Sequence, residues 1–512
     1  MEQSFIDNSD EQILKEVETR LQRANKDRDH HKKRLDDYYR LAMPWRHLSG
    51  QEYSESNIDE IFDNTAVDST VDFASEMRAT FTPENFEWME AVPASTLGPV
   101  EAEEVKPQAR EYNGSIFYEI RRSNFQAESL ECYQDLSHGT MALMIVDRDP
   151  SRPIHCEAIP ANEIRIARGI NKEVDLRAID SLIYADQVIS LFPKAQENQT
   201  LIDELKNNPS SEIKITQAVW RDYSDLGNEK WKYVAYYGKY ILDKDVYVGA
   251  GSCPFIVARW MTDSSTSWGI GPGYLQLPNI KTANLLKELI LKNADYAVDP
   301  ATAYDDDGIM NLEQGLAPGV HIPRAPGSKI DILESRSQFD VGYFQQNELR
   351  DEIKRGYYQD QPFQKGKTPP TAEQWLDEAA RAARRMGAPA GRLVTEWQIP
   401  IYKRFAYLLG KRGILPKVEL GGKIVTLQPS SPLIRKQKID EALNIQRYIG
   451  VLASVVGIEM ANMIVNKPEA AHQLKELMNV PDGVILKKEE IKQLVAQTMA
   501  SNMAETAQNV MG

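Results

Sequence analysis

The chain has 512 residues, a hydrophobic content of 42% and a formal net charge of −15 at pH 7. These values indicate a folded protein with roughly two to four cores and exclude a disordered chain. The acidic balance also excludes a protein that grips nucleic acid over its whole surface, because such binding requires Lys and Arg to neutralise phosphates. Any contact with DNA is therefore expected to be local or brief.

Cysteine usage and hydropathy point to a reducing cytoplasm. Cys132, Cys156 and Cys253 fit neither a paired disulfide framework nor a CxxC metal site. The first residues do not show the basic segment followed by an apolar segment that is typical of a secretion signal. No apolar run approaches the ~20 residues needed to span a bilayer. We therefore expect no membrane span.

The first predicted element is one long charged helix from Glu11 to Trp45, which Pro44 ends. Its apolar residues recur at steps of three and four, with Arg28 and His31 as interruptions. They are Leu14, Val17, Leu21, Ala24, Leu35, Tyr38 and Ala42. This seam fits two interpretations, a surface helix that lies on its own domain or an intersubunit coiled coil.

Two further helical stretches and a β-rich region follow. The helices are predicted from Thr65 to Phe81 and from Val105 to Ser137. After Gly139 the periodicity changes to short β-rich runs and a hairpin about a turn at 225–228. The predicted strands are Met141 to Val146, Ile154 to Ile166, Ile213 to Arg221 and Trp231 to Tyr240. The sequence thus predicts a mixed α+β domain that is followed by mainly helical segments.

Two helices bracket a segment rich in proline and glycine. Helical periodicity runs from Leu277 to Tyr296 and again from Val341 to Tyr358. Between them, dense Pro and Gly with short apolar runs at Val320 to Ile322 and Ile330 to Ile332 predict a small β excursion.

A loop from Gln359 to Lys367 leads into a strong helix-start signal. Thr371 can cap the helix while Gln374 bonds back to the cap, and the two preceding prolines forbid helix just upstream. The helix is predicted to break at Gly387 to Gly391 and to resume as far as Gly410, with Pro389 and Pro400 making it kinked or segmented. Later helices are predicted at Lys436 to Ala461, Glu469 to Met478 and Lys488 to Met503.

No motif indicates catalysis. Gly366-Lys367-Thr368 resembles the end of a phosphate-binding loop, but Gln361 stands where the first glycine belongs and prolines replace the helix start. Gly269 to Gly273 lacks the GxGxxG spacing and is better explained as a turn before a helix.

Two acidic clusters and one histidine pair are the candidate metal sites of the sequence. Neighbouring carboxylates such as those of Asp305 to Asp307, or of Asp147 with Asp149, point apart unless a loop gathers them. His30 and His31 are adjacent on a helix and cannot share one ligand. We therefore expect solvated turn residues, no metal and no cofactor, although a metal-dependent hydrolase that uses Asp305 to Asp307 remains an alternative.

Several short signatures occur in a specific order over roughly residues 30 to 420. They are Tyr38 to Trp45, Asn64 to Asp68, Phe73 to Met77, Phe81-Thr-Pro83 with Phe86 and Trp88, Pro254 to Trp260, Gly269 to Gly273 with Asn279 and Asn284, Pro370 to Glu373, Gly391 to Glu396 and Arg412 to Pro416. This order resembles the head-to-tail connecting (portal) family of short-tailed bacteriophages. The chain departs from the family in having Pro370 directly before the Thr-Ala-Glu signature.

The resemblance implies an α+β, mainly α portal fold and a ring, typically of twelve subunits, at one capsid vertex. It implies a wing at 1–271, stem helices at 272–298 and 341–357, a clip at 299–340, a tunnel loop at 358–370, a long broken helix returning to the wing at 371–429, and a helical crown with a C-terminal tail at 430–512. It implies assembly in the host cytoplasm, a place in the virion, and no enzymatic activity. The implied partners are double-stranded DNA passing through the channel, the terminase large subunit, a tail adaptor protein, and the major capsid and scaffolding proteins.

An acidic channel would repel DNA and let it slide. Only a few side chains would then hold the DNA in the channel. The candidates in the tunnel loop are Lys365 and Lys367, with Gln361 and Gln364 as neutral contacts and Phe363 as an apolar tip. Two alternatives stay open: a solvated loop that never touches DNA, and an oligomeric scaffold protein of the virion without a channel.

Overall fold

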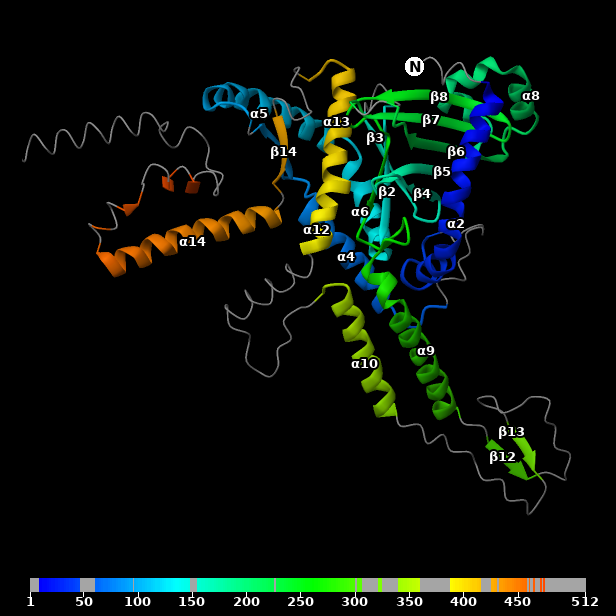
Figure 1. Ribbon diagram of the computed structural model, residues 1–512. Coiled ribbons are helices and arrows are strands. Elements are labelled where there is room, and N and C mark those ends of the chain that lie inside the picture. Colours follow the sequence, from blue (N-terminus) through cyan, green and yellow to red (C-terminus); the bar gives the residue numbers. More distant parts are fainter. Residues whose placement is uncertain are drawn as a thin grey trace, which may run out of the picture. The chain divides into compact units, whose positions relative to one another are not determined.

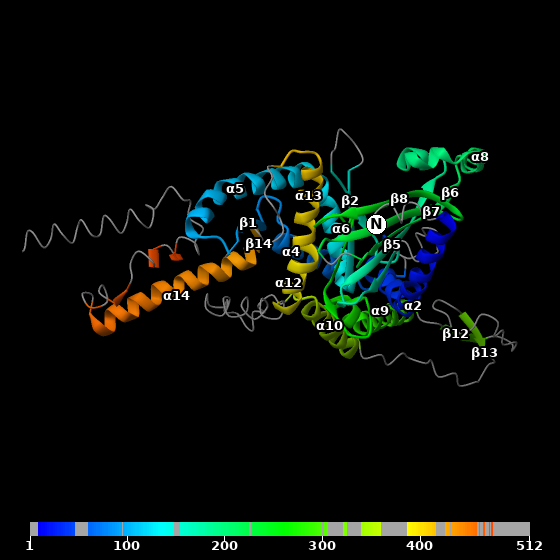
Figure 2. The ribbon, with the colours of Figure 1, turned by 45° about the horizontal axis from the view of Figure 1, so that its top comes forward.

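The computed structural model describes residues 9–46, 60–94, 96–147, 154–224, 227–299, 302–305, 321–324, 339–359, 387–415, 425–430 and 432–457, with a few isolated residues up to 474. The chain divides into two compact units. Unit 1 comprises Met1–Ala79 and Ala91–Leu427, and unit 2 comprises Thr80–Glu90 and Gln428–Gly512. Helices predominate and the strands form small sheets (Figures 1 and 2), so the predicted α+β, mainly α fold is confirmed.

The largest sheet of unit 1 is antiparallel, with the strand order β4-β5-β6-β7-β8. Its strands are β4 (Ile164–Arg168), β5 (Val174–Tyr184), β6 (Glu212–Arg221), β7 (Lys230–Tyr237) and β8 (Tyr240–Val248). The predicted hairpin corresponds to β6 and β7, in which Arg221 pairs with Trp231. Three short helices link β5 to β6: α7 (Val188–Leu191), the 3-10 helix η1 (Pro193–Glu197) and α8 (Gln199–Asn207).

The N-terminal helix α2 (Asp10–Ala42) covers one face of this sheet with its first half (Figure 1). Its buried residues Ile13, Val17, Leu21 and Ala24 form one core with Leu176, Ala178, Ala218, Trp220 and Val234 of the sheet. Its second half contacts α9 (Pro272–Val298). The apolar seam is thus satisfied within the chain, which confirms the surface-helix interpretation; the intersubunit coiled coil is wrong for α2.

A second, three-stranded sheet lies against α6 (Phe125–His138) in the order β3-β2-β9. Its strands are β2 (Thr140–Val146), β3 (His155–Ile159) and β9 (Phe255–Arg259). The helix predicted from Val105 to Ser137 is in fact two helices, α5 (Pro99–Arg122) and α6. The chain turns between them because the Asn124 side chain donates to the carbonyl of Cys156 (2.7 Å) and accepts from its N–H (2.9 Å).

The helix α4 (Thr65–Phe81) has the predicted bounds and buries Phe73, Ala74 and Met77. The predicted β excursion contains a parallel pair, β12 (Thr302–Asp305) with β13 (His321–Arg324). The run at Ile330 to Ile332 lies outside the described residues. A two-stranded pair, β10 (Met261–Thr262) with β11 (Gly269–Ile270), precedes α9.

The last helix of unit 1 is continuous from Gly387 to Lys411 but changes pitch midway. The segment α12 (Gly387–Leu393) leads into a π-helical turn, η2 (Val394–Gln398), and then into α13 (Ile399–Lys411). Gly387 to Gly391 are helical, so the break predicted at these residues is wrong, whereas the residues just before Gly387 lie outside the described part of the chain. The π turn directly before Pro400 segments the helix as expected.

Unit 2 contains the helix α14 (Pro432–Val456), which confirms most of the helix predicted from Lys436 to Ala461. The strands β1 (Met89–Pro93) and β14 (Val425–Pro429) form a two-stranded sheet. Beyond this sheet, the Ser430 N–H donates to the carbonyl of Trp88 (3.0 Å). Apart from a few isolated residues, the two later predicted helices lie outside the described part of the chain.

Candidate oligomerisation surface and its anchor

The helices α9 and α10 (Phe339–Gly356) form an antiparallel pair (Figure 1). Their direction follows from two close approaches, because Gly342 faces Ile290 at one end and Gly356 faces Gln276 at the other. The buried side of α9 is built from Leu277, Ile280 and Ala283. The antiparallel pair thus projects from one anchored base.

A second side of α9 exposes large apolar residues. Leu275, Leu285 and Leu289 are 54%, 55% and 48% exposed. Together with exposed Pro278 and Thr282 they recur at steps of three and four, which is the spacing of a helix-packing seam. We call these five residues the α9 stripe. The helical periodicity from Leu277 to Tyr296 does not by itself indicate the stripe, although the spacing of its residues in the sequence could have revealed it.

The base of the helix pair is fixed by a buried hydroxyl cluster. The Tyr38 hydroxyl lies 2.9 Å from Thr70 Oγ1, 2.6 Å from Ser137 Oγ and 2.9 Å from Tyr357 Oη. Burial raises the pKa of Tyr38 and of Tyr357, so both phenols stay protonated at neutral pH. These bonds tie α2, α4 and α6 to the end of α10.

A carboxylate provides a second anchor. Asp63 accepts hydrogen bonds from Gln346 Nε2 (2.9 Å), Arg350 Nε (2.8 Å) and the Thr65 N–H (3.0 Å). Burial alone would raise the pKa of Asp63, but these bonds lower it below its usual value. The Asn284 side chain also accepts from the Asp63 N–H (3.1 Å), so that both helices of the pair hold the same segment.

The loop that follows α10 begins from a fixed residue. Gln359 donates from Nε2 to the Ser69 carbonyl (2.9 Å), and its Oε1 accepts from the Ser69 hydroxyl (3.1 Å). The predicted tunnel-loop residues Gln361, Phe363, Gln364, Lys365 and Lys367 lie outside the described residues, as do the predicted cap residues Thr371 and Gln374 and the Gly366 to Thr368 motif.

The glycine-rich motif at 269–273 precedes a helix, as predicted, but it is not a turn, because Gly269 and Ile270 form β11 and Pro272 already begins α9. Gly271 precedes the first turn of α9, and its N–H donates to the His138 carbonyl (2.8 Å). A Cβ at Gly269 would overlap the Gly139 carbonyl, and one at Gly273 would overlap the Tyr38 ring. The glycines of this motif allow its backbone to pack closely against the backbone of His138 and Gly139 at the base of α9.

Of the other acidic and histidine candidates, Asp147 and His31 have structural partners. Asp147 accepts from Arg412 Nε (3.0 Å), and Asp149 lies outside the described residues. His31 shares a hydrogen bond with Thr266 (2.8 Å). Asp305 ends β12, whereas Asp306 and Asp307 are not described. Within the described ranges, no three His, Cys, Asp or Glu side chains are grouped to hold a metal ion.

The three cysteines are unpaired and buried. Burial raises the pKa of each thiol, to about 12 for Cys156, so none is a ready nucleophile. In the part of the chain that the structure describes, no helix is long and apolar enough to cross a membrane.

The family model described as bacteriophage head to tail connecting protein matches residues 14–486, which is most of the chain. The chain belongs to this family. The head-to-tail connecting family is one of structural connectors rather than enzymes. No curated protein shows significant sequence similarity to this member of the family.

Two solved structures resemble this head-to-tail connecting protein at low identity. One is a chain of the neck of an empty gene transfer agent particle, with 12% identity and a TM-score of 0.35. The match covers 85% of the present chain and 96% of the neck chain. The other is a chain of the virion of a native gene transfer agent particle, with 11% identity, a TM-score of 0.29 and the same coverage.

Proposed function

We propose that the chain is a portal subunit, of which about twelve copies close into a ring at one capsid vertex. DNA enters the head through this ring during packaging and leaves through it on ejection. The terminase large subunit and a tail adaptor dock on the ring, and the major capsid and scaffolding proteins surround it. The ring is assembled in the host cytoplasm and remains in the virion.

The observation that carries the proposal is the α9 stripe, in a member of a connecting family. A row of exposed residues on a projecting helix that includes three leucines marks a surface that is covered in the assembly. In a closed ring one face of a subunit meets a different face of its neighbour. The α9 stripe supplies one such face, and Tyr343 and Phe344 of α10, which are 59% and 70% exposed, supply apolar groups for the other.

The assignment of segments follows from the same proposal. The α9–α10 pair is the stem, the β12–β13 segment belongs to the clip, and the sheets with α2 belong to the wing. Residues 358–370 form the tunnel loop, 371–429 return to the wing, and 430–512 form the crown and tail.

Removing the stripe tests ring formation. The double variant Leu285→Ser with Leu289→Ser is expected to lower the ring fraction at least about tenfold while the subunit stays folded, because both side chains are already exposed. Mass measured by light scattering after size exclusion, with end-on images of the particle, reports the ring and its opening.

The matched control is Leu182→Ser with Tyr184→Ser, which removes exposed apolar groups from β5 (68% and 47% exposed). This control should assemble normally. A wild-type chain that stays monomeric under all assembly conditions, or that forms particles without a central opening, contradicts the proposal.

A further inference from the structure

A pocket of about 510 Å³ opens in unit 1 where α9 meets the second half of α2 and the segment at 60–62. Its apolar lining comes from Leu41, Phe62 and Leu285, of which Phe62 is 37% exposed and Leu285 is 55% exposed. Leu285 also belongs to the α9 stripe, so the pocket adjoins the surface assigned to ring contacts. We call it the α9 pocket. Pockets of this volume hold small molecules, so an aromatic side chain fits in it.

The charged groups around the α9 pocket are already paired. Three ion pairs include all five charged residues of its lining. They join Lys281 to Asp37 (2.5 Å), Arg40 to Glu60 (4.0 Å) and Glu288 to Lys292, one turn further along α9 (2.6 Å). Because these charges cancel, the pocket has no surplus charge to attract an ion. Its chemistry therefore favours an uncharged apolar occupant.

The α9 pocket and the exposed ring of Phe344 lie on opposite sides of the α9–α10 pair. Gly342 faces Ile290 across the pair, and each residue of a helix advances by about 100° around its axis. Phe344, which is 70% exposed, is thus about 200° around α10 from the side that faces α9. Lys281 of the pocket is about 180° around α9 from Ile290. A head-to-tail ring contact requires two different surfaces on opposite sides of a subunit in this way.

The pocket and the aromatic ring also lie at the same level along the pair. The contacts of Gly342 and Gly356 with α9 fix the antiparallel register, which places Phe344 level with Glu288 of the pocket. Neighbouring subunits of a closed ring are related by rotation about its axis, without a shift along it. With the pair running along that axis, Phe344 of one subunit meets the α9 pocket of the next.

The charges that follow Phe344 on α10 complement the rim of the pocket. Glu348 and Asp351 continue the outer side of α10 and have no ion-pair partner in the described part of the chain. The same register places Asp351 level with Lys281. The side chains of Lys281 and Arg40 keep 47% and 43% of their surface exposed, so they can accept a second carboxylate. Complementary charges of this kind fix the register of a contact.

We propose that the Phe344 side chain of one subunit inserts into the α9 pocket of the next subunit. This contact rests on the proposed ring and specifies how its α9–α10 pairs meet. The phenyl ring packs against Leu41, Phe62 and Leu285, while the carboxylates that follow it on α10 face Lys281. An aromatic side chain that fills a pocket in this way dominates the binding energy of an interface.

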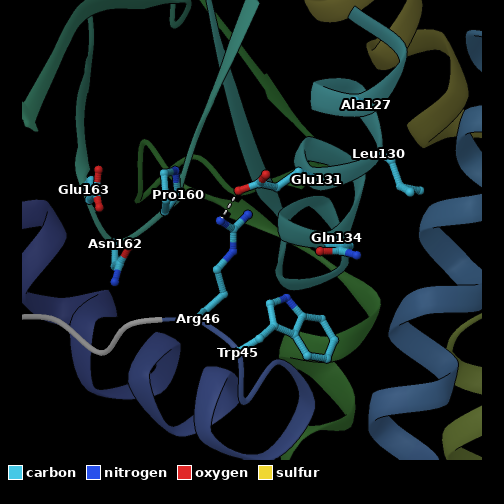
Figure 3. A pocket seen from close by; sticks show the side chains of 9 residues that line it. All are labelled: Trp45, Arg46, Ala127, Leu130, Glu131, Gln134, Pro160, Asn162 and Glu163. Carbon is cyan, nitrogen blue, oxygen red and sulfur yellow. Dashed lines mark hydrogen bonds and ion pairs between the residues drawn. The ribbon is translucent and has the colours of Figure 1, made fainter. Parts of the chain in front are cut away.

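A second pocket of unit 1 provides a control position. It measures about 420 Å³ and lies between the end of α2, α6 and the turn after β3, where Arg46 bonds Glu131 (Figure 3). Gln134 of α6 lines it, and the lining residues described include none from the α9–α10 pair. A cysteine at residue 134 therefore lies in a pocket that α10 of a neighbour does not reach.

Cross-linking tests the contact with Phe344 left in place. The variant Glu348→Cys with Lys281→Cys carries one thiol on each side of the pair, and the three native cysteines are buried. A short bismaleimide, which adds to two thiols, should convert assembled rings into a ladder of covalent multimers on a denaturing gel. Glu348→Cys with Gln134→Cys, and each single variant, should remain monomeric. Dimers from Glu348→Cys alone would indicate a two-fold contact and overturn the proposal.

Removing the aromatic ring gives the second test. Phe344→Ser is expected to lower the ring fraction about tenfold and to abolish the ladder in the Glu348→Cys with Lys281→Cys background. Gln345→Ser, at the next exposed position of α10, should assemble like the wild type. Circular dichroism verifies that both variants fold.

The outcomes separate this contact from the ring itself. Wild-type rings with a central opening, combined with no ladder or with normal assembly of Phe344→Ser, overturn the Phe344 contact and leave the portal proposal standing. A wild-type chain that stays monomeric under all assembly conditions overturns both.

Discussion

Arg259 of β9 shows how a single buried charge is held in this fold. Its Nη2 donates to Glu396 Oε1 (2.7 Å) and its Nε to Oε2 (3.2 Å), while its backbone N–H also donates to Oε2 (3.1 Å). The Arg259 side chain is 3% exposed, whereas that of Glu396 is 19% exposed. The π-helical turn η2 carries this carboxylate to the edge of the three-stranded sheet.

Replacing Arg259 should therefore be costly. Arg259→Met is expected to lower the free energy of unfolding by about 3 kcal/mol, because the Glu396 carboxylate loses its buried partner. Urea unfolding followed by circular dichroism measures the change. A loss below about 1 kcal/mol would mean that the pair adds little to stability.

The matched control removes the other arginine that binds the same carboxylate. Arg392 lies one helical turn before Glu396 at 2.9 Å and is 35% exposed. Arg392→Met is expected to cost less than about 1 kcal/mol, as for other pairs that reach solvent.

The sequence signatures contain both members of this pair but do not indicate that they pair. Arg259 and Glu396 each fall in a signature that supported the family resemblance, yet they are 137 residues apart in the chain. Local spacing carries no information on such a contact, because it depends on how β9 and η2 pack. The same holds for Arg46 with Asp135 and for Tyr38 with Tyr357.

At the scale of elements, the start of α9 is closely packed. Gly273 lies directly against the Tyr38 ring, which its three hydroxyl partners hold in place. Any side chain at residue 273 must displace either that ring or the first turn of α9.

Substitution of Gly273 and of Gly342 by alanine is therefore expected to change the free energy of unfolding in opposite directions. Gly273→Ala is expected to lower the free energy of unfolding by about 2 kcal/mol, in the range of overpacked cores, despite the better helix propensity of alanine. Thermal and urea unfolding measure the effect. An unchanged stability would show that Tyr38 moves at little cost.

Gly342 of α10 is the control. A Cβ there would lie 3.5 Å from Ile290 Cδ1, which is an ordinary contact. Gly342→Ala should therefore be neutral or stabilise the chain by up to about 1 kcal/mol.

Helices were more predictable than strands in this chain. The bounds of α2, α4 and α10 follow from periodicity and from stop signals such as Pro44. The strand β8 was missed because Asp243, Lys244 and Asp245 break its apolar alternation, as charges on an edge strand often do. Periodicity predicts that α9 starts at Leu277, five residues after its observed start at Pro272, and Pro278 lies inside the helix.

At the scale of the whole molecule, the net charge of −15 determines how strongly the proposed ring attracts or repels DNA. Like charges repel the duplex from the wall, so the ring grips DNA only where a cation reaches it. Lys365 and Lys367 are the proposed cations, because they lie in the segment that follows the fixed residue Gln359.

The double variant Lys365→Ala with Lys367→Ala should assemble normally but package or retain less DNA. The expected fall is severalfold, since two phosphate contacts per subunit are lost around the ring. Nuclease-protected DNA per particle measures it. The control Lys206→Ala with Lys239→Ala removes two exposed lysines elsewhere. Equal filling of both double variants removes the proposed role of the tunnel-loop lysines.

The helix α2 joins two regions that are otherwise distant in sequence. With 33 residues it is about 50 Å long. Its first half is embedded in the core of the five-stranded sheet, and its second half reaches α9 through a hydrogen bond from Arg34 to the Tyr274 carbonyl (2.6 Å) and an ion pair from Lys281 to Asp37 (2.5 Å). Because α2 is held at both places, a tilt of the sheet relative to the α9–α10 pair would have to bend this helix or break its bonds to Tyr274 and Lys281.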